Sequence, residues 1–148
     1  MAGVEPVRLV APGGEGLVRV GATAIFTGWG DAHTIRTEHE GEGTTRDRMK
    51  AGHVALISGQ ACTRAYAASR QALAAASLRL CTSTRGGVGH CYADSGGPLA
   101  VDAGGTPVQI GVVSLALGCG DPRYPSVYAR LDNGAINAFV RAATAGSG

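Results

Sequence analysis

A serine lies between an acidic residue and two glycines in the segment from Cys91 to Leu99, which reads CYADSGGPL. A serine hydroxyl is a weak nucleophile at neutral pH, and it attacks a carbonyl only when a base takes its proton and a carboxylate orients that base. The glycines allow a tight turn of the backbone around the hydroxyl. This pattern is typical of a hydrolase nucleophile, and Ser95 is the candidate.

The four histidines are the candidate bases for that serine, because histidine is the side chain that most often accepts such a proton. His33 and His39 fall in a long polar segment, and His53 falls in a predicted strand. We expect ordinary structural or surface roles for these three. His90 is close to Ser95 in sequence and is considered below.

Length and composition indicate one all-β domain over residues 1–148. The chain has 148 residues, 24 glycines and only 5% aromatic residues. Its apolar runs are short and broken by turn-forming residues, as in chains with many short strands. The net charge is only +2 and forms no basic stripe, which argues against nucleic-acid binding. No apolar stretch approaches the length of a membrane span, so we expect no membrane partner.

The apolar pattern predicts six strands joined by polar connections. A Gly- and Pro-containing turn over residues 102–107 is the strongest hairpin signal. The segment 31–47 lacks periodicity and is expected to form a flexible loop, and the tail 143–148 is expected to be frayed. The predicted strands cover residues 7–10, 22–27, 48–57, 99–101, 108–113 and 127–131.

Two segments predict helices. Residues 63–78 are rich in Ala, Leu, Arg and Gln, which favours a short helix there. Near the C-terminus, Asp132 or Asn133 can cap a second helix. In that helix the apolar side chains recur at intervals of three and four residues, so we expect them to pack on the rest of the fold. These apolar residues are Ile136, Phe139 and Val140.

The cysteines number four and show neither a CxxC pair nor a zinc-ligand spacing with histidine. Disulfides are therefore expected rather than a metal site, and disulfides require an oxidising compartment. The first residues lack the basic and apolar regions of a signal peptide. Both observations would be satisfied if Met1 were an internal position of a longer, secreted precursor. The cysteines are Cys62, Cys81, Cys91 and Cys119.

Four short motifs resemble, in order, the second half of the chymotrypsin-like (trypsin-fold) serine endopeptidases, and the resemblance runs from about Pro6 to Ala143. It implies a single antiparallel six-stranded Greek-key β-barrel, the second half of a double barrel, with a C-terminal helix. It also implies disulfides Cys62–Cys81 and Cys91–Cys119. The motifs are TGWG at 27–30, DSGGPL at 94–99, GVVS at 111–114 and PSVYAR at 125–130.

The same resemblance implies roles for residues around the serine. Ser95 would be the nucleophile, and the amides of Ala93 and Ser95 would donate to the oxyanion. Asp94 would order the loop, through a cation or while staying solvated. The family usually has glycine at the position of Ala93, so a Cβ there would disfavour a positive φ and leave the oxyanion hole imperfect.

The specificity pocket implied by the resemblance has Gly89 at its base and His90 beside it. Ala116 and Ser126 would stand at its walls. No acidic residue occupies the base, so a small or medium apolar side chain is expected, with an acidic one as the alternative if His90 is protonated. The resemblance places His90 along this pocket rather than facing the nucleophile. An extended peptide would pair with Ser114, Leu115 and Ala116.

The family's base lies in an Ala-Ala-His-Cys segment and its orienting acid in an Asp-Ile-Ala-Leu type strand, and neither occurs in this sequence. Two hypotheses follow. The chain is the nucleophile-bearing piece of a secreted serine endopeptidase, inactive alone, whose partners are a polypeptide substrate and a missing N-terminal barrel. Alternatively, it is a non-catalytic peptide- or protein-binding pseudoprotease module. Neither hypothesis requires a metal or another cofactor.

Overall fold

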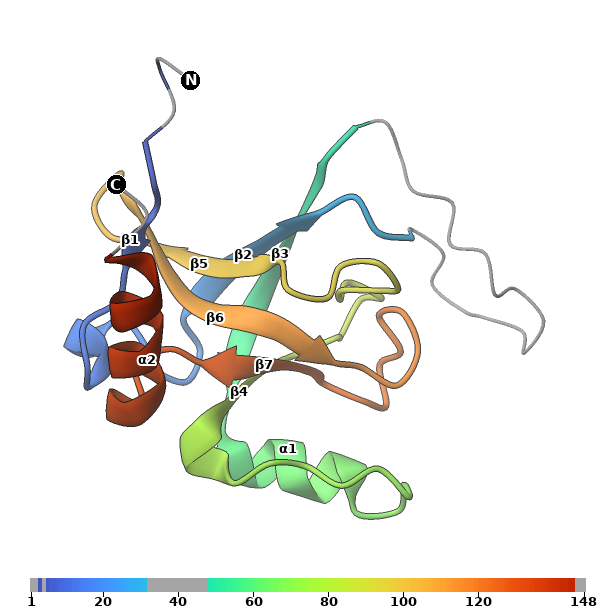
Figure 1. Cartoon of the computed structure of the whole chain (residues 1–148). Helices are drawn as coiled ribbons and strands as arrows, with labels where there is room; N and C mark the ends of the chain where they lie inside the picture. Colours follow the sequence, from blue (N-terminus) through green and yellow to red (C-terminus); the bar gives the residue numbers. More distant parts are fainter. Residues whose placement is uncertain (1–2, 4, 32–47, 146–148) are drawn as a thin grey trace.

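Six antiparallel strands close into a barrel (Figure 1). The computed structural model describes residues 3, 5–31 and 48–145. Around the barrel the order is β2, β3, β4, β7, β6 and β5, and pairing of β5 with β2 completes the ring. The predicted fold class is confirmed. The strands are β2 (Thr23–Gly28), β3 (Lys50–Ile57), β4 (Arg79–Thr82), β5 (Pro98–Asp102), β6 (Pro107–Leu115) and β7 (Ser126–Arg130).

A short strand joins the barrel from outside. β1 (Arg8–Leu9) pairs in parallel with β6, a partner that the sequence did not indicate. A 3-10 turn, η1 (Gly14–Gly16), follows it. The predicted hairpin between β5 and β6 is confirmed, and the Asp102 carboxylate accepts the Gly105 amide in its turn at 2.6 Å.

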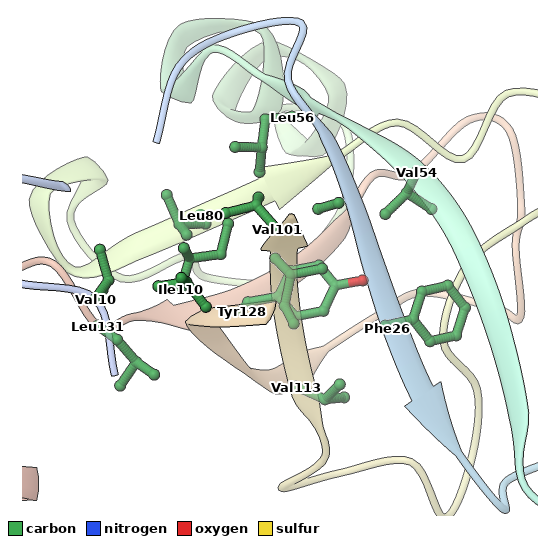
Figure 2. Packing of buried hydrophobic residues seen from close by; sticks show 13 residues of the cluster. Val10, Phe26, Val54, Leu56, Leu80, Val101, Ile110, Val113, Tyr128 and Leu131 are labelled. Atoms are coloured by element: carbon green, nitrogen blue, oxygen red, sulfur yellow. The ribbon is translucent and has the colours of Figure 1, made fainter. Parts of the chain in front are cut away.

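The barrel interior is filled by side chains that alternate along the strands, as a period of two requires. In β3, for example, Val54 and Leu56 are buried while the alternate residues His53 and Ala55 are exposed. Figure 2 shows Tyr128 in the middle of this cluster, with Ile110 and Phe26 on its two sides. Full burial of each such aliphatic side chain contributes about 1.5–3 kcal/mol. The barrel is therefore a firm support for the loops at its ends.

The C-terminal helix α2 (Gly134–Thr144) packs against this barrel (Figure 1). Its cap is Asn133, whose side-chain oxygen accepts the amides of Ala135 and Ile136. Asn137 is buried and donates to main-chain oxygens of Val10 (2.7 Å) and Leu131 (2.8 Å). The tail residues 143 and 144 belong to the helix.

Phe139 does not pack on the barrel as predicted. Its side chain is 73% exposed, whereas Ile136 and Val140 do contact the core. The reason is the helical period of 100° per residue. The buried Asn137 marks the centre of the face that meets the barrel, and Phe139 lies about 200° further around the helix. The apolar pattern alone did not show that a polar residue would occupy that centre.

The first helix lies earlier in the chain than its predicted range of 63–78. α1 (Gly59–Tyr66) begins after Ser58, whose hydroxyl accepts the Ala61 amide, and only the 3-10 turn η2 (Ala76–Leu78) follows before β4. The intervening residues are not helical because tertiary contacts hold them otherwise. The buried Arg79 guanidinium donates to main-chain oxygens of Ala74 and Gly59.

Most of the predicted loop 31–47 lies outside the described residues, as do residues 146–148 of the predicted tail. Neither helix of the described chain has the length and apolar character needed to cross a bilayer.

Candidate functional site

The protein has two disulfides, and one of them holds the loop that carries the candidate serine. Cys91 is bonded to Cys119, which joins the serine loop to the segment after β6. Cys62 is bonded to Cys81, which joins α1 to β4. Both predicted pairs are confirmed.

Ser95 lies in the connection between β4 and β5, and its side chain is exposed. The glycines after it tie this connection to β6 by main-chain hydrogen bonds. Gly96 N donates to Val113 O at 3.0 Å, and Val113 N donates to Gly97 O at 2.9 Å. Among the described residues, no side chain forms a hydrogen bond with the Ser95 hydroxyl. The hydroxyl is thus held on a fixed loop and is accessible.

Asp94 points away from Ser95 into the protein and is only 7% exposed. Its carboxylate was expected to meet a cation or to stay solvated, but it is buried, and among the described residues it forms no ion pair. Oδ1 accepts the Gly30 amide at 2.9 Å, and Oδ2 accepts the Cys91 amide at 2.9 Å. The carboxylate packs so closely on Gly28 and Gly30 that a Cβ at either would collide with it. The TGWG turn therefore binds this carboxylate, through the Gly30 amide and through close packing at Gly28 and Gly30.

Ala93 adopts a left-handed backbone conformation with φ of 68°. Only glycine takes this conformation without a steric cost, and for other residues the cost is about 1 kcal/mol. The sequence correctly identified this position as one where a Cβ conflicts with a positive φ. The Asp94 hydrogen bonds on the next residue hold the strained conformation in place.

We expect Ala93→Gly to raise the free energy of unfolding by about 0.5–1 kcal/mol, because glycine relieves the strain while adding some entropy to the unfolded chain. Urea denaturation measures this change. Ala103→Gly, in the β5–β6 turn, is the matched control and should not stabilise, because Ala103 is not among the residues with positive φ. A destabilised Ala93→Gly variant would contradict the expectation.

A cavity of about 180 Å³ opens beside Ser95. It brings together most of the residues named from the sequence, since it reaches from the serine loop to the end of β6. Ser114 is exposed at this end, where the pairing of β6 with β7 is irregular between Val113 and Leu115. The lining residues are His90, Cys91, Tyr92, Ala93, Ser95, Ser114, Leu115, Ala116, Gly118 and Cys119.

Two residues predicted for the pocket do not line this cavity. Ser126 is fully buried, with an exposure of 0%. Gly89 packs against it: a Cβ at Gly89 would lie 2.8 Å from Ser126 Oγ and 3.0 Å from Thr84 Cγ2. The predicted base and one predicted wall of the pocket therefore pack against each other, outside the lining of this cavity.

His90 is packed in the protein with an exposure of only 2%. Its Nε2 lies 3.3 Å from Val127 O, and its ring meets the Tyr128 ring edge-on at 5.0 Å between centroids. Burial lowers the pKa of His90, although the Val127 carbonyl and the Asp94 charge act in the opposite direction. The imidazole is therefore neutral at neutral pH.

A second cavity, of about 400 Å³, borders Ser95 and involves two residues that the sequence analysis did not single out. Trp29 and Met49 line it together with Ala93 and Ser95, and both side chains are more than half exposed, at 53% and 54%. Trp29 lies in the TGWG turn, which was the available signal. Ser95 thus has a cavity on each side.

The described histidines do not reach the serine. His53 is exposed on β3 and lines a different cavity with Arg19 and Asp102. His33 and His39 lie outside the described residues. Within the described part of the chain, no three His, Cys, Asp or Glu side chains are grouped so that they could hold a metal ion.

The closed barrel and its disulfide-linked serine loop are those of a trypsin-fold barrel. The family model described as Trypsin matches residues 2–138, and the chain belongs to the trypsin family of serine proteases. It is 36% identical to Trypsin-1 of Astacus astacus over 126 residues, which are 84% of this chain and 47% of that protein. It is 38% identical to Transmembrane protease serine 9 of Rattus norvegicus over 113 residues, 75% of this chain and 10% of that protein. The chain therefore spans half or less of the length of these relatives.

Proposed function

We propose that this chain is the nucleophile-bearing barrel of a secreted serine endopeptidase. The observation that carries the proposal is the position of Ser95, exposed at the edge of a cavity that also reaches the end of β6. A peptide lying along Ser114 and Ala116 would bring a carbonyl group to this hydroxyl. Two disulfides fit an oxidising compartment, which supports secretion.

The serine loop also offers donors for the charge that would develop during the attack. In the described residues, neither Ala93 N nor Ser95 N donates a hydrogen bond to the protein. Both amides are therefore available to the oxyanion of a tetrahedral intermediate, where the loss of one donor costs on the order of 3 kcal/mol of barrier. Asp94 does not touch the reacting atoms and acts as a positioning residue. It fixes the loop through the Gly30 and Cys91 amides.

The base that removes the Ser95 proton comes, in our proposal, from a separate N-terminal barrel. Three observations support this step. Of the described histidines, neither His53 nor His90 forms a hydrogen bond with Ser95, and the base and acid motifs of the family do not occur in the sequence. The chain also matches only 47% of Trypsin-1. This chain alone would then be unable to activate its own nucleophile.

Chemical rescue tests the proposal. A fluorophosphonate probe should label the chain alone at no more than the background rate. Addition of free imidazole, which supplies the base from solution, should raise labelling of Ser95 by at least about tenfold. Ser95→Ala should abolish the rescued labelling, and mass spectrometry of the labelled peptide identifies the site.

A matched control separates the nucleophile from other surface hydroxyls. Ser114→Ala removes an exposed serine in the same cavity and should leave labelling unchanged. Robust labelling without imidazole that depends on Ser95 would overturn the need for an external base. Failure of imidazole to produce any Ser95 labelling would instead support the non-catalytic peptide-binding alternative.

A further inference from the structure

We infer that the cavity beside Ser95 selects a small uncharged side chain from the peptide, and that His90 is the residue that sets this limit. The inference rests on the proposed function, since it names the substrate class for the same site. It concerns binding, however, and it can be tested without turnover.

His90 sets the limit first by its bulk. The imidazole lines the cavity but is almost fully buried, so it occupies space in which a deeper pocket would otherwise continue. It is held there on two sides, by Tyr128 and by Phe26, whose ring centroid lies 6.4 Å away in an edge-on arrangement. The contact with Val127 O fixes its orientation. Packed in this way, the ring cannot swing aside for a larger side chain without losing these contacts.

Next to His90 in the chain, the space that a side chain at Gly89 would enter is also occupied. The Gly89 position is filled by its neighbours Ser126, Thr84 and Gly120, the last with its Cα 3.1 Å from where a Cβ would lie. The cavity of about 180 Å³ also has to hold the peptide carbonyl at Ser95 and the main chain beside Ser114. Only part of that volume is left for the side chain, which favours residues of the size of alanine or valine.

The site offers no partner of opposite charge to an acidic or a basic side chain, and it therefore excludes both. A carbonyl only accepts hydrogen bonds, so His90 Nε2 carries its proton toward Val127 O and Nδ1 is left as an acceptor. An acceptor nitrogen offers nothing to a carboxylate. For a basic side chain there is no anion, because the described lining residues include no Asp or Glu and the Asp94 carboxylate is turned toward Gly30.

The test is a binding titration that does not depend on an active nucleophile. The ¹⁵N-labelled chain is titrated with peptides of the form N-acetyl-Ala-Ala-Pro-X-amide, where X is Ala, Val, Phe, Glu or Arg. Amide shifts of the lining residues report binding. We expect saturable shifts with Ala and Val, and affinities at least about tenfold weaker with Phe, Glu and Arg.

Two variants separate the bulk of His90 from its chemistry. His90→Ser opens the space, and binding of the Phe peptide should strengthen by at least about tenfold while the Ala peptide changes little. His90→Leu keeps the bulk without the hydrogen bond and should still exclude the Phe peptide. Near-UV circular dichroism establishes whether each variant is folded. If a variant does not fold, the affinity ranking of the five peptides with the wild-type chain tests the inferred selectivity.

Preference of the wild-type chain for Glu, Arg or Phe would overturn the inference, as would a lack of saturable binding with every peptide. An equal gain in affinity for the Phe peptide in His90→Ser and His90→Leu would also contradict it. Failure of the proposed function gives a different result, because the peptide ranking can hold even when imidazole produces no labelling of Ser95. The same titration on Ser95→Ala should give the same ranking.

Discussion

Replacement of Asp94 with alanine is expected to lower the free energy of unfolding by about 3–4 kcal/mol, because it leaves two buried main-chain donors without partners. The Gly30 and Cys91 amides both donate to this carboxylate at 2.9 Å. Each unsatisfied buried donor costs about 1–3 kcal/mol, and bonds to a charged acceptor are the stronger ones. The variant should also lose peptide binding at the Ser95 cavity, because the preceding residue is Ala93, whose strained φ of 68° then has less to hold it.

Urea denaturation and the peptide titration measure the two effects. Asp102→Ala is the matched control, since it removes a carboxylate that accepts one amide in an exposed turn. We expect it to cost less than about 1 kcal/mol and to leave peptide binding unchanged. Asp94→Asn retains one acceptor oxygen and should fall between wild type and Asp94→Ala. Equal losses in Asp94→Ala and Asp102→Ala would show that the carboxylate does not hold the loop.

Local patterns in the sequence were sufficient for five of the six barrel strands and for the serine loop. Strands alternate with a period of two, and the hairpin turn at 102–107 carries its own turn residues, so each could be predicted without its neighbours. The sixth strand, β4, was not predicted, because all four of its residues are buried and show no alternation. The motifs around Trp29 and Ser95 are contiguous and therefore visible in one dimension. The disulfide pairs followed from the resemblance that these motifs established.

Features set by long-range contacts were not predictable in this way. The helix predicted at 63–78 lies at Gly59–Tyr66 instead. The Arg79 guanidinium, sixteen residues after Thr63, donates hydrogen bonds to Thr63 Oγ1 and to the main-chain oxygens of Gly59 and Ala74, and these contacts hold the segment in this arrangement. The exposure of Phe139 depends on Asn137 meeting Val10, which is 127 residues distant. Composition favours a helix at 63–78 and burial of Phe139. The contacts that decide otherwise, from Arg79 to Thr63 and from Asn137 to Val10, join residues that are distant in sequence.

The pocket shows the same limit at the level of single atoms. The resemblance named Gly89 and Ser126 as pocket residues, but Ser126 is buried, and Thr84 and Gly120 pack closely around Gly89. The depth of a pocket depends on many such packing contacts between residues that are distant in sequence. The resemblance placed His90 along the pocket, and His90 lines the cavity beside Ser95, whereas its contact with the Tyr128 ring became visible only in the fold.

Removal of the Cys91–Cys119 disulfide by replacing both cysteines with alanine is expected to lower the free energy of unfolding by about 3–4 kcal/mol. The bond closes a loop with a sequence separation of 28, and its loss returns conformational freedom to the unfolded chain. Both cysteines line the Ser95 cavity, one on the serine loop and one in the segment after β6. Loss of the bond therefore frees two sides of the cavity from each other, and peptide binding should fall with the stability.

The second disulfide provides the comparison that separates these two effects. Cys62 and Cys81 enclose a separation of 19, so replacing both with alanine should cost a similar amount, about 3 kcal/mol. Neither lines the cavity, since Cys62 lies in α1 and Cys81 lies in β4. At a temperature where both double variants are folded, binding of the Ala peptide should persist in Cys62→Ala/Cys81→Ala and be lost in Cys91→Ala/Cys119→Ala. If the two variants bind equally well, the cavity is held by the barrel strands and hydrogen bonds alone, and the Cys91–Cys119 bond contributes stability without positioning the site.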